Sequence, residues 1–378
     1  MGEDQDMETL LELFAQIEDP RVKRSREYSL AEILFLVLAA VVSGMNHFTH
    51  VEDFGKLKLE WLRTILPYEN GVPSHDTIGR VLGQLDPDAL EVMFLKWMNG
   101  VAKNLEGVVA VDGKTLRGAI KRGDKRAFVH MVSAFGSANG LVYGAVKTAE
   151  KSNEIEAIPR LLELLHLNGA IVTIDAMGCQ AEVMNKIIDR GGDFVIAVKQ
   201  NQPTLGNDID IAFHDIDIRG GEGFASTAEV EEPAHGRGEW RRAETLAADG
   251  HIQDVGKWPH IKTIVRITAE RRVNGQVTQE TRLFASSIAG LPAARAIELV
   301  RAHWGIENRL HWVLDVAFQE DAARVWAANA AENLVVVRHL ALNMLRSVKG
   351  LSGGIARLRN QAGLSDEIRM KVLAASPS

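Results

Sequence analysis

Two short aliphatic runs in the middle of the chain constrain the fold most, because each ends on an aspartate with a glycine close behind. The first run is Val108–Val111, followed by Asp112 and Gly113; the second is Ala170–Ile174, followed by Asp175. Consecutive aliphatic residues bounded by turn signals predict buried strands, and Asp-Gly predicts that a turn ends the first strand. That pair alone also fits a β-hairpin corner. The repeated design favours the other interpretation, a site with paired carboxylates.

The order of elements around these runs predicts the topology of the sheet. The expected strands are 108–111, 128–135, 141–146, 170–174 and 194–198, and the expected helices are 154–167 and 180–189. This β-β-β-α-β-α-β order, with three antiparallel strands followed by right-handed crossovers, is the arrangement of an RNase H-like domain. In such a sheet the first strand is central and the fourth lies beside it. Asp112 and Asp175 are therefore expected on neighbouring strands.

The flanking regions complete an α/β organisation. Ser29 and Glu32 form a capping-box pattern that opens an almost wholly apolar helix, which Gly44 could close. Helices separated by a short break near residues 76–87 fit helix-turn-helix DNA binding or any small bundle. The expected units are an all-α N-terminal domain (1–103), an RNase H-like catalytic domain with a mixed five-stranded sheet and flanking helices (104–202 and 291–348), a β-rich insertion (203–290), and a loosely attached C-terminal tail (349–378).

Composition and charge limit the classes of protein. Of 378 residues, 46% are hydrophobic and 25% are charged, which is ordinary for a globular protein. The formal net charge of −7 argues against a protein that coats nucleic acid, although basic residues gather locally. The single cysteine, Cys179, excludes a disulfide framework and fits a reducing compartment; it is either a small buried residue or a reactive thiolate. The longest apolar run, Ile33–Val42, is too short for a bilayer span, so we expect a cytoplasmic protein with no membrane partner.

A third acid lies on a long helix expected to begin near Ala293 and to run beyond Trp312. Its predicted buried stripe consists of Ile297, Val300, Trp304, Glu307, His311, Leu314 and Phe318. A carboxylate facing a core needs an ionic partner or a metal, so Glu307 is either paired with Arg301, Arg309 or His303, or is a ligand. Three other acids, Asp315, Glu320 and Asp321, lie off this stripe and are expected to face solvent.

Two strand-end aspartates and a helical glutamate suit two-metal phosphoryl transfer, in which two Mg²⁺ ions clamp the attacking and leaving oxygens. Hard cations prefer carboxylate oxygens and keep some of their waters. In this arrangement Asp112 would bridge both ions, while Asp175 and Glu307 would each hold one.

With these residues in place, the chain resembles the DDE transposases of bacterial insertion sequences, in particular the H-repeat-associated, or ISAs-type, group. The similarity extends over nearly the whole chain. It rests on the motifs Tyr28-Ser-Leu-Ala-Glu-Ile, Pro73-Ser-His-Asp-Thr77, Leu85-Asp-Pro87, Val111-Asp-Gly-Lys-Thr-Leu-Arg-Gly118, Thr173-Ile-Asp-Ala-Met-Gly-Cys-Gln180, Val198-Lys-Gln-Asn-Gln-Pro203, His235-Gly-Arg-Gly-Glu239 and His303-Trp-Gly-Ile-Glu-Asn308.

The resemblance implies that Asp112, Asp175 and Glu307 are the catalytic metal ligands of a Mg²⁺-dependent enzyme, with two ions for which Mn²⁺ can substitute. It also implies DNA partners, the terminal inverted repeats of an element and its target DNA, a homodimer on that DNA, and association with the bacterial nucleoid. An RNase H-like nuclease without strand transfer and a catalytically inactive DNA-binding relative are the alternatives.

One departure from the wider superfamily concerns the glutamate helix. Its pattern there is Tyr, two residues, Arg, three residues, Glu, six residues, Lys, and in this chain the four positions hold Val300, His303, Glu307 and Leu314. Phosphate contacts must therefore come from other side chains. The candidates for contact with DNA are Lys114, Arg117, Lys199, Asn201, Gln202, Arg237, Arg301, His303 and Trp304. Trp304 could stack on an unpaired base or pack in the core, and Asn201 and Gln202 could touch DNA or cap a loop.

Overall fold

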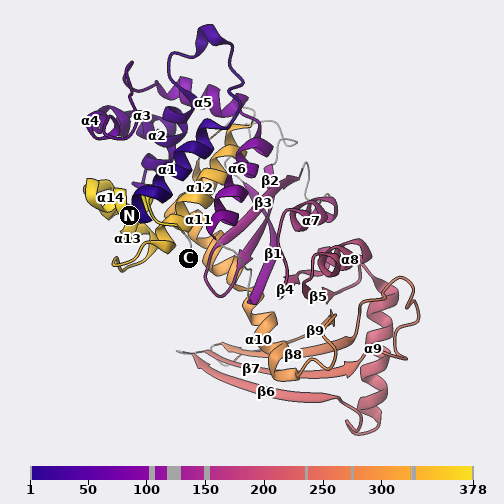
Figure 1. The fold of residues 1–378 in the computed structure, drawn as a ribbon. Coiled ribbons are helices and arrows are strands. Elements are labelled where there is room, and N and C mark those ends of the chain that lie inside the picture. Colours follow the sequence, from indigo (N-terminus) through magenta and orange to yellow (C-terminus); the bar gives the residue numbers. More distant parts are fainter. Residues whose placement is uncertain are drawn as a thin grey trace, which may run out of the picture.

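The computed structural model describes residues 2–101, 107–116, 129–148, 154–234, 237–273, 276–323, 325 and 329–376 (Figure 1). Arg117, a predicted contact to DNA, lies outside these residues. Among the described helices, none is both long enough and apolar enough to cross a bilayer.

The first hundred residues are helical, as expected. The helices are α1 (Gly2–Ala15), α2 (Leu30–Val42), α3 (Phe48–Leu57), α4 (Leu59–Leu62), α5 (His75–Gln84) and α6 (Pro87–Val101), with a 3₁₀ turn at Lys23–Ser25. The predicted capping box is present, since Ser29 Oγ accepts from Glu32 N at 3.1 Å and Glu32 Oε2 accepts from Ser29 N at 2.9 Å. All of α2 except Ala31 is buried, which confirms that an all-apolar helix is internal. Gly44 follows its end with a φ of +94°.

The predicted strand order is confirmed. The elements are β1 (Gly107–Leu116), β2 (Val129–Gly136), β3 (Val142–Thr148), α7 (Glu154–Glu163), β4 (Ala170–Ile174), α8 (Ala181–Asp189) and β5 (Asp193–Val198). β1 pairs antiparallel with β2 and parallel with β4, and β4 pairs parallel with β5. The first strand is therefore central and the fourth lies beside it.

The insertion extends this five-stranded sheet to nine strands. It consists of α9 (Pro203–Ile218), β6 (Ser226–Ala234), β7 (Arg237–Ala247), β8 (Thr263–Val273) and β9 (Gln276–Ser286). Because β9 pairs antiparallel with β5, the order across the sheet is β3-β2-β1-β4-β5-β9-β8-β7-β6. Figure 1 shows the insertion strands projecting away from the N-terminal helices, with α10 (Ala293–His303) between them and the central strands.

The predicted turn at Asp112-Gly113 is wrong. β1 continues to Leu116, and Asp112 pairs with Ser133 of β2 while Gly113 pairs with Val132. The glycine is required by close packing instead of by a turn. A Cβ atom at Gly113 would lie 2.4 Å from His130 Nε2 and 2.7 Å from Glu154 Oε1, a pair of groups that are themselves only 2.6 Å apart.

The predicted long helix is interrupted. After α10 the chain makes a π-helical turn at Glu307–His311, continues as α11 (Trp312–Ala317), and ends in a 3₁₀ turn at Glu320–Ala322. A π-turn inserts an extra residue into the helix. Within it Leu310 is buried and Glu307 is exposed. Of the predicted stripe, His311, Leu314 and Phe318 are buried, whereas Glu307 in the turn and Trp304 before it are exposed.

The C-terminal residues are not the loosely attached tail that was expected. Two helices, α13 (Ile355–Leu364) and α14 (Asp366–Leu373), pack against α2 beside α12 (Ala330–Ser347). Arg359 and Arg369 are 2% and 0% exposed, and Arg359 donates to the carbonyl oxygen of Val41. Figure 1 shows this C-terminal group among the N-terminal helices.

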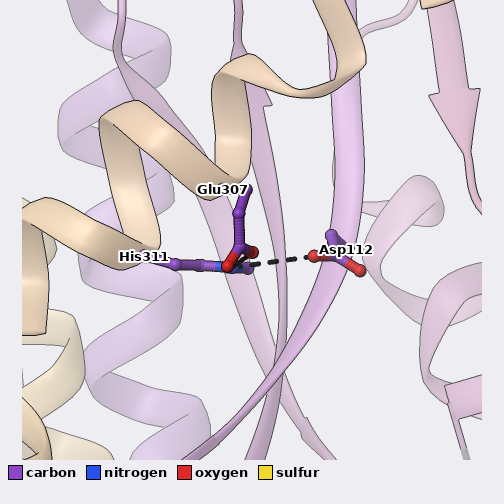
Figure 2. A group of neighbouring side chains, drawn as sticks. All are labelled: Asp112, Glu307 and His311. Atoms are coloured by element: carbon purple, nitrogen blue, oxygen red, sulfur yellow. Dashed lines mark hydrogen bonds and ion pairs between the residues drawn. The ribbon is translucent and has the colours of Figure 1, made fainter. Parts of the chain in front are cut away.

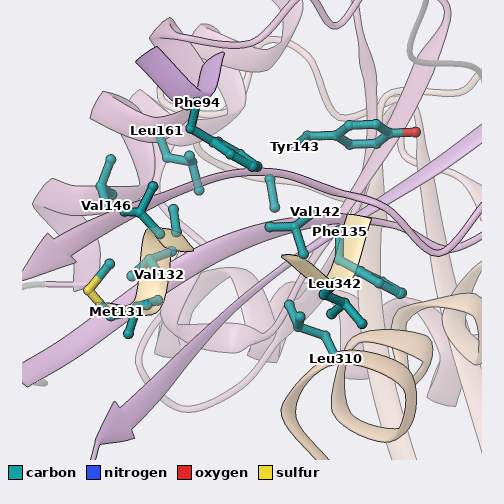
Figure 3. Packing of buried hydrophobic residues seen from close by; sticks show 14 of the residues in the cluster. Phe94, Met131, Val132, Phe135, Val142, Tyr143, Val146, Leu161, Leu310 and Leu342 are labelled. Carbon is teal, nitrogen blue, oxygen red and sulfur yellow. The ribbon is translucent and has the colours of Figure 1, made fainter. Parts of the chain in front are cut away.

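The main core surrounds β2 and β3. Figure 3 shows Phe94 of α6, Leu161 of α7 and Leu342 of α12 reaching these two strands. Leu310 of the π-turn joins the same cluster, with 0% exposure. The helix that bears Glu307 is thus anchored in the core from which β1 projects Asp112.

Substituting Gly113 with alanine is expected to destabilise the fold by about 1–3 kcal/mol, because the new methyl group overpacks against His130 and Glu154. Gly206 of α9 is the matched control, since the nearest atom to its Cβ position is 3.8 Å away. Its alanine variant should be neutral or slightly more stable. Chemical denaturation measures both, and a Gly113→Ala change below about 0.5 kcal/mol would contradict the packing argument.

Candidate active site

Asp112 and Asp175 lie at adjacent points of the sheet. The parallel pairing of β1 with β4 ends at Val111 and Ile174. Asp112 is the next residue of β1 and Asp175 is the first residue after β4, so both carboxylates lie at the carboxyl end of β4. The Asp112 side chain is 28% exposed. Asp175 is exposed and caps the 3₁₀ turn Ala176–Gly178, because its Oδ1 accepts from Met177 N at 2.9 Å.

The π-turn brings Glu307 and His311 to Asp112 (Figure 2). His311 Nδ1 lies 3.2 Å from Glu307 Oε2 and 3.6 Å from Asp112 Oδ2. One ligand atom from each of the three residues lies within 4.8 Å of the others. Asp175 is not a member of this group, although it lines the same cleft. The imidazole therefore stands between two carboxylates contributed by a strand and a helix.

A cleft of about 310 Å³ contains all three predicted acids, Asp112, Asp175 and Glu307. Its walls include the apolar side chains Val195, Phe284, Val300 and Ile306 and the polar side chains Thr173, Lys199, Arg282 and His303. A second groove of about 740 Å³ along the insertion strands shares Arg282, Phe284, Val300 and Trp304 with the cleft. The two hollows therefore meet at the α10 end of the insertion.

The carboxylates of the cleft do not titrate alike. Burial raises the pKa of Asp112 to about 6; His311 opposes this shift, while the charges of Asp175 and Glu307 add to it. A hydrogen bond from His311 lowers the pKa of Glu307. Burial lowers the pKa of His303, whose Nδ1 lies 3.1 Å from Thr173 Oγ1. Carboxylates crowded at one point repel one another unless a cation binds between them. Such crowding is typical of a metal site.

The donor set fits a divalent cation. Mg²⁺ ligands lie at about 2.1 Å, so neighbouring ligands in an octahedral shell are about 3 Å apart. The separations of 3.2 Å and 3.6 Å around His311 Nδ1 are close to that value. Asp112 and Glu307 could hold such an ion, and Asp175 lines the adjoining wall of the cleft.

Lys114, a predicted contact to DNA, has protein partners in this structure. Its side chain is 11% exposed, and Nζ lies 2.5 Å from Asp315 Oδ1 and 2.8 Å from Glu320 Oε2. Burial lowers the pKa of Lys114, but the two carboxylates outweigh it and raise that pKa overall. Lys114 follows Asp112 by two residues on β1 and so shares its face. It ties the strand of Asp112 to the helical segment that follows Glu307.

The expectation that Asp315 and Glu320 face solvent is therefore wrong. Glu320 is 3% exposed and also lies 3.4 Å from Arg338 of α12, and Asp315 is half-buried against Lys114. A carboxylate can be buried where nearby cations compensate its charge. The prediction considered only the spacing along one helix and not the cations Lys114 and Arg338, which come from other elements.

Asn201 and Gln202 cap the loop after β4. Asn201 Nδ2 donates to the Ala176 carbonyl oxygen at 2.5 Å, and Gln202 Nε2 donates to the Cys179 carbonyl oxygen at 2.9 Å. The structure thus gives both amides a role in holding the segment next to Asp175. Contact with DNA remains a prediction for these residues.

The remaining predicted residues are distributed over the two hollows. Lys199 and His303 line the cleft, Arg301 lines the groove, and Trp304 lines both. Trp304 is 46% exposed and lies 5.4 Å from the Arg282 guanidinium. Trp304 therefore lies at the surface and does not pack in the core. The side chain of Arg237 lies outside the described part of the structure, and so does Arg117.

Two residues at the site were not assigned from the sequence. His311 was recognised only as an unexpected member of a buried stripe, and its i, i+4 spacing from Glu307 was the available signal. Arg282 belongs to the insertion that was predicted to be β-rich, but nothing in the sequence shows that β9 borders β5. Tertiary pairing of the insertion brings it to the cleft.

Known proteins with similar sequences support a common family. The family model described as Transposase DDE domain matches residues 103–344, and the one described as DDE_Tnp_1-associated matches residues 11–98. "Putative transposase YncI" of Escherichia coli O157:H7 is 38% identical over 98% of this chain and 95% of its own length. "H repeat-associated putative transposase YhhI" of Escherichia coli K12 is 35% identical over 98% of this chain and 99% of its own.

Among solved structures, a piggyBac transposase in a synaptic complex with hairpin DNA is 9% identical, with a TM-score of 0.44 over 97% of this chain and 78% of that chain.

Cys179 is expected to resist thiol reagents in the native protein. It is 0% exposed, and burial raises its pKa to about 12, so almost no thiolate is present at neutral pH. Iodoacetamide labelling followed by mass spectrometry should show no adduct until denaturant is added. Rapid labelling of the folded protein would contradict this and restore the alternative of a reactive thiol.

Lys114→Met is expected to destabilise the protein by about 3–5 kcal/mol, because it leaves Glu320 buried with only Arg338 as a nearby cation. The matched control is Lys371→Met in α14, where the ion pair with Glu367 is exposed and should contribute nothing measurable. Thermal and urea unfolding distinguish the two variants. Equal unfolding midpoints for Lys114→Met and the unsubstituted protein would show that the buried ion pair of Lys114 with Glu320 does not stabilise the fold.

Proposed function

This chain belongs to the DDE transposase family, and from that premise we propose that it cleaves and joins DNA at the ends of an insertion sequence. The observation that carries the proposal is that Asp112, Asp175 and Glu307, three acids from separate parts of the sequence, line one cleft. The relatives in Escherichia coli carry names of putative transposases, which agrees with this activity.

The proposed reaction consists of two in-line displacements at phosphorus. In the first, a water oxygen forms a bond to the phosphorus at the element end, the bond from phosphorus to the 3′ oxygen breaks, and the leaving oxygen takes up a proton as a 3′-OH. In the second, that 3′-OH attacks a phosphodiester of the target, so one P–O bond forms and one breaks. No covalent bond between protein and DNA is required.

The acids would act through their negative charge and their spacing. Asp112, Asp175 and Glu307 would together hold the ions. Two Mg²⁺ ions, for which Mn²⁺ can substitute, would when bound polarise the phosphate and activate both nucleophiles. The half-buried position of Asp112 limits solvent at the reacting phosphate, and the apolar wall of Val195, Phe284 and Val300 strengthens electrostatic interactions there.

The groove beside the cleft is the proposed path of the DNA. Arg241, Arg271, Arg282 and Arg301 line it, and Trp304 lies where the groove meets the cleft. Arg282 is paired with Glu280 at 2.7 Å, so phosphate would have to compete for that guanidinium. An exposed tryptophan at this junction can stack on an unpaired base beside the cut. Lys199 adds a positive charge on the cleft wall.

The remaining parts of the proposal concern the assembly. The helical residues 1–103 would form the domain that recognises the element end, and two copies would hold two ends as a homodimer. The protein would act in the bacterial cytoplasm, where its DNA lies in the nucleoid.

Asp112→Asn is expected to lower strand cleavage by about 1000-fold or more, the effect of losing about 4 kcal/mol of transition-state stabilisation. Binding to the element end should be unchanged. The measurement uses labelled duplexes with the sequences that flank the gene, incubated with Mg²⁺, and maps the cut strands on sequencing gels.

Asp215→Asn, a change to an exposed acid on α9, is the matched control and should cleave normally. Duplexes with precut 3′ ends separate a transposase from a nuclease, because only the former joins them to target DNA. Full cleavage by Asp112→Asn would refute the assignment of the site, and absence of all Mg²⁺- or Mn²⁺-dependent turnover in the unsubstituted protein would favour an inactive DNA-binding relative.

A further inference from the structure

His311 stands at the centre of the acid cluster without a role in the function proposed above. Its side chain is 7% exposed, and its Nδ1 is the atom nearest to the carboxylates of both Glu307 and Asp112. Its Nε2 is buried and has no hydrogen-bond partner among the described residues. A buried imidazole therefore directs one nitrogen into the cluster and leaves the other unsatisfied.

The geometry of the π-turn explains how this position arises. The turn begins at Glu307 and ends at His311, so the two side chains lie on the same face, and Figure 2 shows both directed at Asp112 on β1. Leu310, between them in sequence, is 0% exposed and anchors the turn in the core. π-turns occur frequently at functional sites because the inserted residue redirects side chains.

We propose that His311 Nδ1 is a third protein ligand of the cation held by Asp112 and Glu307. The inference rests on the proposed function and adds a nitrogen to what the sequence motif presents as an all-oxygen site. The three ligand atoms lie within 4.8 Å of one another, as expected for one coordination shell. Binding of the ion displaces any proton on Nδ1, so that metal uptake releases that proton to solvent.

The nitrogen ligand has a consequence for the choice of metal. Imidazole is a softer ligand than carboxylate, and Mg²⁺ is bound chiefly by oxygen, whereas Mn²⁺ accepts both. This site should therefore prefer Mn²⁺ to Mg²⁺ more strongly than a site made of carboxylates alone. Replacing the imidazole by a carboxylate should reverse part of that preference.

The test is pulsed electron paramagnetic resonance of Mn²⁺ bound to the full-length protein, which detects coupling to a ligand ¹⁴N nucleus directly. The unsubstituted protein should show this coupling, [¹⁵N]histidine labelling should change it to the ¹⁵N pattern, and His311→Ala should abolish it. His303→Ala is the matched control, because His303 lines the same cleft but bonds to Thr173, and it should retain the coupling.

Affinity provides the second measurement. His311→Ala should weaken Mn²⁺ binding by about 10–100-fold, and His311→Asp should narrow the ratio of Mn²⁺ to Mg²⁺ affinity. Circular dichroism confirms that each variant is folded, with His311→Gln as the substitute if alanine is not tolerated.

The outcomes separate the two proposals. Bound Mn²⁺ without nitrogen coupling, or coupling that survives in His311→Ala, would overturn the assignment of His311 even if cleavage depends on Asp112. Failure of the unsubstituted protein to bind Mn²⁺ at all, with or without element-end DNA, would overturn both this inference and the function on which it rests.

Discussion

The parallel pairing of β1 with β4 is the constraint on which the rest of the site depends. It ends at Val111 and Ile174, so the next residue on each strand is an aspartate at the same edge of the sheet. That register matters because a slip of one residue in either strand would turn its acid to the opposite face of the sheet. β1 then continues along β2, and the pairing of Asp112 with Ser133 holds Asp112 in extended backbone.

The glutamate reaches this edge through a second set of interactions. The π-turn places Glu307 and His311 toward Asp112, and Leu310 fixes the turn in the core. Behind it, Lys114 joins β1 to Glu320, close to the end of the same helical segment. The acids are thus crowded by packing and by a buried ion pair that forms without metal. Their mutual repulsion is what a bound cation would relieve.

Much of the architecture follows from the sequence. Alternation and aliphatic runs predicted the β-β-β-α-β-α-β order, and the capping box of Ser29 predicted the start of α2. The failures have specific causes. The Asp112-Gly113 pair predicts a turn, but the glycine is required because a Cβ atom there would clash with His130, a residue on the neighbouring strand. A regular helical period could not foresee the π-turn at Glu307–His311. It also put Trp304 on the buried face of the helix, whereas this side chain lies at the surface. Pairing of β9 with β5, which brings Arg282 to the cleft, depends on the assembled sheet.

In the proposed reaction, Asp112, Asp175 and Glu307 together hold divalent metal at the point of DNA cleavage. Anomalous X-ray diffraction from crystals of the protein with element-end DNA and Mn²⁺ tests it most directly. Anomalous peaks are expected within about 2.3 Å of carboxylate oxygens of all three residues. An ordered cleft with DNA bound and no peak at these carboxylates would contradict it.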